Sequence, residues 1–250
     1  MKRCLLLISG LLSVFGDDVA VDAGSGGSIP IPKSSPGDPH KLLATGEREF
    51  RAKSYETSVR LLSEALALTN GDTSLRIKVL YARHKSFMSQ QKLPMAISDL
   101  SSVIELDSNH VLAHLQRANL ELMTGKCAEA VADYKRVLIL DSGKKDAHSR
   151  VPHASECAAA LERAEHAKAQ KNPDALRQAL TDATAEGRAT SAPNLLAQRA
   201  QAFVDLGGEE NVASALADLA RVLKMDPNNV GAYALRGRAL MLHGDFGTGA

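Results

Sequence analysis

Apolar residues recur at helical spacing in a twelve-residue pattern that the chain repeats three times. Residues 96–107 (AISDLSSVIELD), 130–141 (AVADYKRVLILD) and 215–226 (ALADLARVLKMD) share an alanine, an aspartate followed by a bulky residue, a valine and a closing aspartate. In the middle copy, Ala130, Tyr134 and Val137 share one face of a helix with 3.6 residues per turn. Each copy therefore predicts an amphipathic helix whose small residue lets a neighbouring helix approach closely.

A second helix, with its own small residue, is predicted before the later two copies, at Arg117-Ala118 and Arg199-Ala200, and again after the last copy, at Arg236-Gly237. The turn between the two helices is clearest at residues 124–126, where Gly125 supplies the positive φ that ends a helix. The first two copies are 34 residues apart, and a fixed period of this size is typical of helical repeat arrays. One helix pair cannot bury its apolar stripe alone, so the predicted fold is all-α, an α-solenoid of stacked antiparallel helix pairs.

The pairs divide into two groups, residues 39–150 with units one to three and residues 151–250 with a degenerate fourth unit and further units. The first unit starts at Pro39 and the second near Ile77, where His84 stands at the small-residue position. Residues 142–152 interrupt the rhythm, and a long alanine-rich helix is expected over 154–171. The sixth unit is incomplete at Ala250, so we interpret the sequence as a fragment or an early-ending reading frame.

The first 38 residues are predicted to hold an export signal and a linker rather than part of the folded array. Residues 1–23 have a short basic start, an apolar run over residues 4–15 and small residues after it, which is typical of a secretory signal peptide. The run is too short for a bilayer-spanning helix, so no membrane span is expected after signal cleavage. Residues 24–38 are rich in Gly, Ser and Pro and predict a flexible linker.

Composition narrows the possible functions. The formal net charge is +1 and no basic stripe is evident, so nucleic acid is not an expected partner. The sequence has no phosphate-binding loop and no GxSxG nucleophile motif, so neither a cofactor nor an enzymatic activity is expected. His110 and His114 have the spacing of metal ligands on a helix, but no third ligand is evident, and we interpret them as surface histidines.

The cysteines leave an alternative open. Cys4 leaves with the signal peptide, and no CxxC or metal-ligand spacing is present. Cys127 and Cys157 either pair in an oxidising compartment or remain as two free thiols in helix packing. The sequence favours the two free thiols.

These residues resemble the tetratricopeptide repeat (TPR) over residues 39 to 250, most specifically in the third unit. Residues 113–118 (AHLQRA), 125–126 (GK) and 128–130 (AEA), together with 95–106 (MAISDLSSVIEL), resemble endoplasmic-reticulum co-chaperones of the DnaJ subfamily C member 3 type. In that family a TPR superhelix holds unfolded clients, and a J domain stimulates the lumenal heat-shock chaperone BiP. The His-Pro-Asp motif of a J domain is absent here, so a BiP-type partner is expected only if a J domain is supplied. The resemblance implies location in the lumen of the endoplasmic reticulum.

Another TPR class clamps the acidic tails of cytosolic chaperones with Lys, Arg and Asn side chains. The places that match those donors carry no cation in this chain, and Glu47 would repel an acidic tail. The five places are Leu43, Glu47, Ala82, Leu112 and Gln116. The sequence therefore argues against a carboxylate clamp.

First helices of TPR units line the inner wall of the superhelix, and here the predicted wall is apolar. The predicted client-binding residues are Leu43, Phe50, Tyr81, Met88, Leu112, Leu115 and Leu122. Lys78, Lys85 and Asn119 are expected beside them. An exposed apolar patch marks a binding site, and methionine adapts to varied partners. For Phe50, Met88 and Leu122, a role in the core between helices is an equal alternative.

Two functions remain open. The first is a protein-interaction module that binds unfolded or misfolded clients as the TPR part of a co-chaperone. The second is a TPR scaffold that assembles one specific protein partner without chaperone activity.

Overall fold

The computed structural model describes residues 37–247, except for the side chains of residues 243 and 245–247. The predicted signal peptide at 1–23 and most of the predicted linker at 24–38 lie outside this range. Residues 37–247 belong to one compact unit. None of the helices in this unit combines the length and apolar character needed to cross a membrane.

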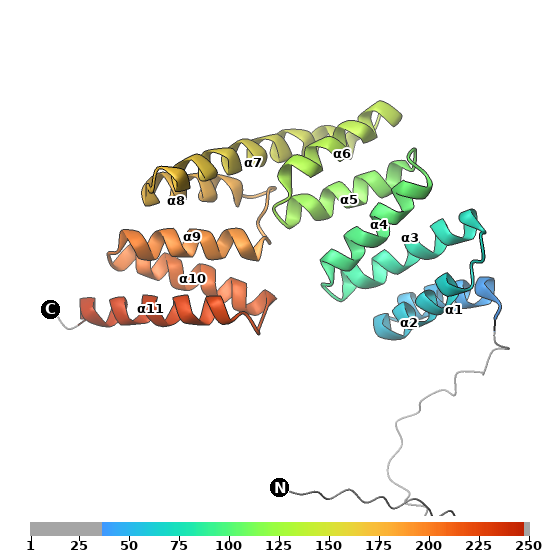
Figure 1. The fold of residues 1–250 in the computed structure, drawn as a ribbon, viewed down its shortest axis with the longest axis horizontal. Helices are drawn as coiled ribbons and strands as arrows, with labels where there is room; N and C mark the ends of the chain where they lie inside the picture. The colour runs from blue at the N-terminus through green and yellow to red at the C-terminus, as the bar shows by residue number, and fades with distance from the viewer. Residues whose placement is uncertain (1–36, 248–250) are drawn as a thin grey trace, which may run out of the picture. The chain divides into compact units, whose positions relative to one another are not determined.

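The described chain is all-α, as the sequence predicts. Its eleven helices form five antiparallel pairs and a last single helix, and each helix packs against the next along the chain (Figure 1). The helices are α1 (Pro39–Arg51), α2 (Tyr55–Ala67), α3 (Thr73–Ser89), α4 (Leu93–Leu106), α5 (Val111–Met123), α6 (Cys127–Leu140), α7 (Lys145–Ala169), α8 (Pro173–Ala183), α9 (Pro193–Leu206), α10 (Glu209–Met225) and α11 (Val230–Gly247). First helices also contact first helices, as α1 does with α3 and α9 with α11. The predicted helix pairs are therefore confirmed.

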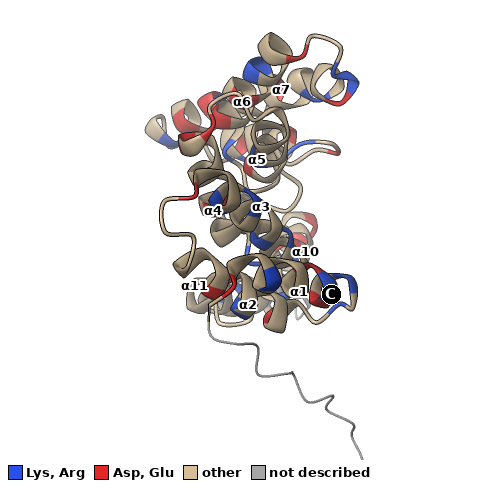
Figure 2. Ribbon diagram, turned by 90° about the vertical axis from the view of Figure 1, so that its right-hand side faces the viewer, with Lys and Arg blue, Asp and Glu red and all other residues tan. Residues whose placement is uncertain are grey.

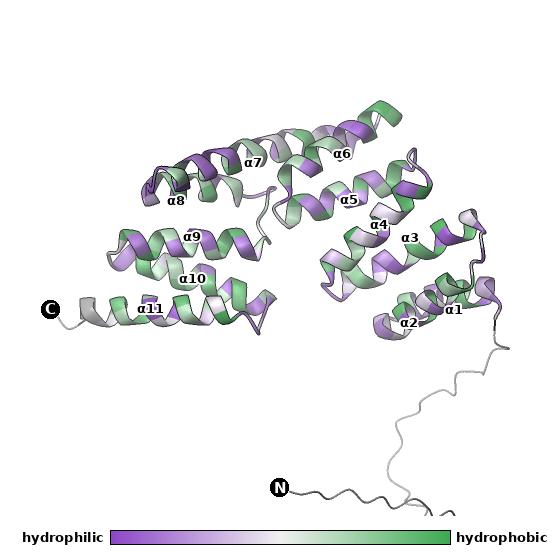
Figure 3. Cartoon of the chain, in the orientation of Figure 1, coloured by the Kyte–Doolittle hydropathy of each residue, from purple (hydrophilic) through white to green (hydrophobic). Residues whose placement is uncertain are grey.

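Hydrophobic residues are interspersed with hydrophilic ones along the helices (Figure 3), and the buried ones form clusters that extend from one pair to the next. One cluster joins α1, α2 and α3 around Leu62, and another joins α3, α4 and α5 around Leu100. The largest cluster surrounds Tyr134 and reaches from α5 to α9, and a fourth surrounds Leu219 between α9 and α11. Because every cluster draws on more than one pair, the pairs stabilise one another.

The turn between the helices of each pair has a position with positive φ. Gly125 (φ 84°) occupies it as the sequence predicts, and the turn between α9 and α10 has two such residues, Gly207 (φ 65°) and Gly208 (φ 83°). Lys53 (φ 63°), Gln91 (φ 59°) and Lys171 (φ 52°) occupy it in the other pairs, although side chains rarely favour this conformation. The repeat thus imposes the turn even where glycine is missing.

Two predicted helix starts are wrong. Helix α7 begins at Lys145, nine residues before the predicted start, and passes through Pro152. Its first turn is held by Ala147, which is fully buried in the largest cluster, so packing overrides the weak helix signal of residues 142–152. Helix α3 begins at Thr73 rather than near Ile77, because the Asp72 carboxylate accepts a hydrogen bond from the Leu75 backbone and caps the helix.

Candidate functional site

A hollow of about 210 Å³ opens between the first helices of units one, two and three. Three of its lining residues, Tyr81, Lys85 and Met88, follow one face of α3 at helical spacing. The full lining is Phe50, Tyr81, His84, Lys85, Met88, Ser89 and Gln116. The hollow is therefore built by side chains that the chain places more than 60 residues apart.

Tyr81 lies at the centre of a small group of rings. Its ring centroid is 4.6 Å from that of His84 and 5.2 Å from that of His110. The Lys85 ammonium lies 4.9 Å from the centroid of the Tyr81 ring, a cation–π arrangement. Burial raises the pKa of the Tyr81 phenol, so the ring keeps its proton at neutral pH. The site offers aromatic surface with one positive charge beside it.

His84 supplies a polar atom beneath this surface. It stands where other first helices have Gly46, Ala118 or Ala200, and its side chain is almost fully buried. Burial lowers the pKa of His84 to about 4, with the charge of Lys85 and then His110 adding to the effect. The imidazole is thus neutral at pH 7, and its Nδ1 has no hydrogen-bond partner among the described residues.

The structure brings together part of the predicted wall. Phe50, Tyr81 and Met88 line one hollow. Leu112 is 44% exposed and lies one helical turn before Gln116 on α5. Leu43 is half-buried and packs against the cluster of the first two units.

Two predicted wall residues lie in the core: Leu115 is wrong as an accessible contact, and for Leu122 the core role that the sequence left open is the one found. Leu115 is 4% exposed and Leu122 is 2% exposed, and both belong to the cluster around Tyr134. Helix α5 has apolar residues on two faces, and these leucines lie on the face that packs inward. Asn119 also turns inward, because its side-chain oxygen accepts a hydrogen bond of 2.7 Å from the Tyr134 hydroxyl. The spacing of apolar residues in the sequence did not show which of the two faces of α5 packs inward.

Three lining residues, His84, Ser89 and Gln116, were not among the predicted contacts. The sequence carried one signal for them, since His84 departs from the small residue that the repeat places there. At the places that a carboxylate clamp would use, Glu47 is exposed and Ala82 is buried. Basic and acidic residues are mixed along the helices (Figure 2).

A buried polar network lies behind α5 and includes one of the two histidines considered as metal ligands. The His114 Nδ1 is 2.8 Å from the Asp133 carboxylate, which also receives two hydrogen bonds from Arg117. Glu121 lies 3.7 Å from Arg117. Burial raises the pKa of Glu121 to about 7, and the nearby charge of Asp133 raises it further than Arg117 lowers it. His114 is therefore not on the surface, which corrects the sequence interpretation.

His110 has a different role, because its Nδ1 accepts a hydrogen bond of 3.1 Å from the Ala113 backbone and caps α5. The two histidines therefore do not converge on a common point. Within residues 37–247, no cluster of three or more His, Cys, Asp or Glu side chains is arranged to hold a metal ion.

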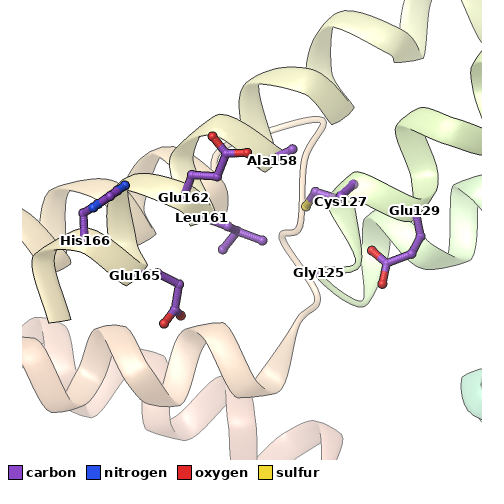
Figure 4. A pocket seen from close by; sticks show the side chains of 9 residues that line it. Gly125, Cys127, Glu129, Ala158, Leu161, Glu162, Glu165 and His166 are labelled. Carbon is purple, nitrogen blue, oxygen red and sulfur yellow. The ribbon is translucent and has the colours of Figure 1, made fainter. Parts of the chain in front are cut away.

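A second hollow of about 360 Å³ lies between the start of α6 and the middle of α7. Figure 4 shows Leu161 and the carboxylates of Glu162 and Glu165 coming from α7, across from Cys127 and Glu129 of α6. Ala158 and Leu161 give it an apolar floor, and the carboxylates give it a negative rim. It is distinct from the Tyr81 hollow in both charge and position.

Cys127 and Cys157 are joined by a disulfide, so the sequence preference for two free thiols is wrong. Both residues are buried in the cluster around Tyr134. The repeat brings the start of α6 beside α7, and 30 residues of separation concealed this contact in the sequence. The bond joins the second helix of unit three to the first helix of unit four.

Comparison with known proteins finds similarity to tetratricopeptide repeat proteins. Residues 198–249 match the family model described as tetratricopeptide repeat. The chain is 34% identical over 122 residues to DnaJ homolog subfamily C member 3 of Rattus norvegicus, covering 48% of this chain and 23% of that protein. It is 28% identical over 100 residues to human DnaJ homolog subfamily C member 7, covering 40% of this chain and 20% of that protein. It is also 28% identical over 108 residues to mouse serine/threonine-protein phosphatase 5, covering 43% of this chain and 21% of that protein.

Among solved structures, the TPR domain of P58(IPK) is similar with a TM-score of 0.64 and 24% identity, covering 84% of this chain and 56% of that one. The chain spans about a fifth of the length of the curated relatives it matches. The expected resemblance to TPR proteins and to DnaJ subfamily C member 3 is confirmed, and the fold is a TPR solenoid. Such an array is a protein-interaction module and is generally not enzymatic.

Proposed function

We propose that the chain binds unfolded or misfolded polypeptides through the Tyr81 hollow, as the TPR part of a co-chaperone in the lumen of the endoplasmic reticulum. The observation that carries the proposal is the meeting of Phe50, Tyr81 and Met88 in one open hollow. Aromatic and thioether side chains bind varied apolar groups, because their contacts depend little on the exact shape of the partner.

The size of the hollow favours single side chains over a folded surface. At about 210 Å³ it is smaller than the roughly 300–1,000 Å³ that pockets for drug-sized ligands occupy. A flexible polypeptide presents many apolar side chains in succession, so each contact is weak and exchangeable. The Lys85 ammonium beside Tyr81 favours a backbone carbonyl or a carboxylate next to the bound apolar group.

Two features support the compartment. Disulfides persist in oxidising compartments such as the endoplasmic reticulum lumen, and Cys127 and Cys157 form one here. The first 23 residues have the composition of a secretory signal peptide. Translation in the presence of microsomes should shorten the chain by about this segment and protect the rest from added protease. A full-length, protease-sensitive product would contradict the compartment.

A lumenal heat-shock chaperone is a partner in this proposal only through a J domain. The 250 residues lack the His-Pro-Asp motif that the J domain needs. The chain alone should therefore suppress client aggregation without stimulating the ATPase of the chaperone.

Client binding is tested by a triple variant in which Phe50, Tyr81 and Met88 become serine. These side chains are half-buried, so the fold should survive the change. Aggregation of a chemically unfolded model protein is followed by light scattering with the wild-type chain and with the variant. The expected result is suppression by the wild type and a loss of at least half of that suppression in the variant.

The matched control changes three exposed apolar residues outside the hollow, Ile139, Met225 and Met95, to serine. The control variant should suppress aggregation like the wild type. Equal suppression by the hollow variant, with helicity unchanged in circular dichroism, would contradict the site. Binding of one folded partner, with no effect on several unrelated unfolded proteins, would favour the scaffold function instead.

A further inference from the structure

His84 is a feature of the Tyr81 hollow that apolar contacts with a client do not explain. Its side chain is only 1% exposed, and its Nδ1 has no hydrogen-bond partner among the described residues. A buried polar atom without a partner destabilises a folded chain, because it has lost its hydrogen bonds to water. An apolar ring of the same shape would fill this place without that cost. Packing alone therefore does not account for a histidine here.

The side chain of His84 is directed at the hollow. Tyr81, His84, Lys85 and Met88 follow one another at helical spacing on one face of α3, and all four line the hollow. Helix α3 lies between α1 and α5 in the array, and both of these helices also contribute lining residues (Figure 1). Because it is almost fully buried and still lines the hollow, His84 forms part of its floor.

The hydrogen-bonding capacity of His84 follows from its charge. Burial lowers its pKa to about 4, so at pH 7 one ring nitrogen carries a proton and the other has a free lone pair. The Tyr81 backbone carbonyl, one helical turn earlier, favours the protonated ring, but it changes the pKa less than burial and Lys85 do. A hydroxyl group can donate to the lone pair or accept from the N–H, so it suits either form of the ring.

We propose that the Tyr81 hollow prefers tyrosine side chains of an unfolded polypeptide, with the tyrosine hydroxyl hydrogen-bonded to His84. This inference rests on the proposed client binding and adds a preference among client side chains. The ring of the bound tyrosine packs against Phe50 and Tyr81, and the thioether of Met88 contacts it as well. Phenylalanine fills the same space but leaves the floor of the hollow unpaired, so it binds more weakly.

A carboxylate is less favourable inside the hollow than at its rim. Lys85 is exposed, so it can meet a carboxylate at the rim, where water screens the contact. Inside the hollow, a carboxylate would lose its water beside apolar side chains, and it could not donate to a lone pair on His84. The floor therefore selects a neutral polar tip on an aromatic body.

The test titrates the full chain into a labelled short peptide of alternating serine and leucine with one central tyrosine, and follows fluorescence anisotropy. The comparison peptide differs only in a central phenylalanine. The tyrosine peptide should bind about three- to tenfold more tightly, which is the factor that one neutral hydrogen bond supplies. His84→Phe should reduce this ratio to about one and keep the binding of the phenylalanine peptide. His84→Asn keeps a donor and an acceptor, so it should retain a preference for tyrosine.

The His84→Phe chain should remain folded, because the change removes an unpaired buried atom, and circular dichroism checks its helicity. Equal affinity of the wild type for the two peptides would overturn the inference, as would a tyrosine preference that survives in His84→Phe. A preference lost in Lys85→Gln but kept in His84→Phe would assign the hydroxyl to Lys85 and would also overturn it.

The same titrations separate this inference from the proposed function. If both peptides bind equally and the serine variant of Phe50, Tyr81 and Met88 loses both, client binding in the hollow stands and only the tyrosine preference fails. If neither peptide binds the wild-type chain, client binding and the tyrosine preference are both contradicted.

Discussion

Arg117 of α5 donates hydrogen bonds to both carboxylate oxygens of Asp133 in α6, from its Nε at 2.6 Å and from an Nη at 2.9 Å. Its remaining Nη donates to the Ser101 hydroxyl of the preceding unit at 3.1 Å. Arg83 and Arg199 make the same three contacts, with Asp99 and Ser63 and with Asp218 and Thr184. One guanidinium thus joins the two helices of a unit and connects that unit to the one before it.

Replacing Arg117 with alanine should lower the free energy of unfolding by about 2–4 kcal/mol, because a buried carboxylate would lose its charged partner. Urea denaturation followed by circular dichroism measures the change. Arg136→Ala is the control, since Arg136 makes an exposed contact with Asn109 and should lose less than about 1 kcal/mol. Equal losses in the two variants would show that the forked pair does not stabilise the array.

Gly46 and Gly237 occupy the same repeat position and should respond oppositely to alanine. Gly46→Ala brings a methyl group within 2.7 Å of Leu62, and the overpacking should destabilise the chain by about 1–3 kcal/mol. Gly237→Ala meets open space and should stabilise α11 by up to about 1 kcal/mol through helix propensity. Thermal melts of both variants beside the wild type check the signs, and destabilisation by Gly237→Ala would contradict the α11 geometry.

Glu121→Gln should change stability in a pH-dependent way. The pKa of Glu121 is about 7 in the folded chain, mainly through burial, against its ordinary value of 4.5. The folded state therefore binds more protons between pH 4.5 and 7, and stability falls as pH rises through this window. The glutamine variant does not ionise, so at pH 8 it should be more stable than wild type by about 1–2 kcal/mol after allowance for solvent screening.

At pH 5 the glutamine variant and the wild type should differ little, because Glu121 is largely protonated in the folded chain. His84 contributes in the opposite direction: its pKa is lowered to about 4, so stability is lost as pH falls from 6.5 toward 4. That contribution is common to both proteins and cancels in the comparison. Glu47→Gln, an exposed change of the same charge on α1 that does not act on Glu121, is the control. If the glutamine variant were more stable than the wild type by the same amount at pH 5 as at pH 8, ionisation of Glu121 would be excluded as the cause.

Reduction of the Cys127–Cys157 bond should destabilise the chain by about 3–4 kcal/mol, as expected for a closed loop of 30 residues. Urea denaturation with and without dithiothreitol measures the loss. In a double alanine variant the reductant should have no effect. If the reductant shifts both proteins alike, the loss does not come from this bond.

The sequence alone determined the class of fold, because a helix pair with one apolar stripe is specified by local periodicity. The small residue, the aspartate and the valine of each second helix set its register, and Gly125 marked a real boundary. Residues without strong local propensity were misjudged, as at the start of α7, where burial of Ala147 decides the outcome.

The candidate site was determined only in part by the sequence. Periodicity placed Phe50, Tyr81 and Met88 on first helices, but it did not show that Leu115 and Leu122 turn into the core. That distinction depends on how α5 is rotated against α6 and its other neighbours, which side-chain volumes from distant segments decide together. The disulfide likewise arises from a contact between units, and Arg117 pairs with Asp133 inside its unit while it reaches Ser101 of the preceding one. Local spacing encodes the units, and only their packing decides which surfaces remain open.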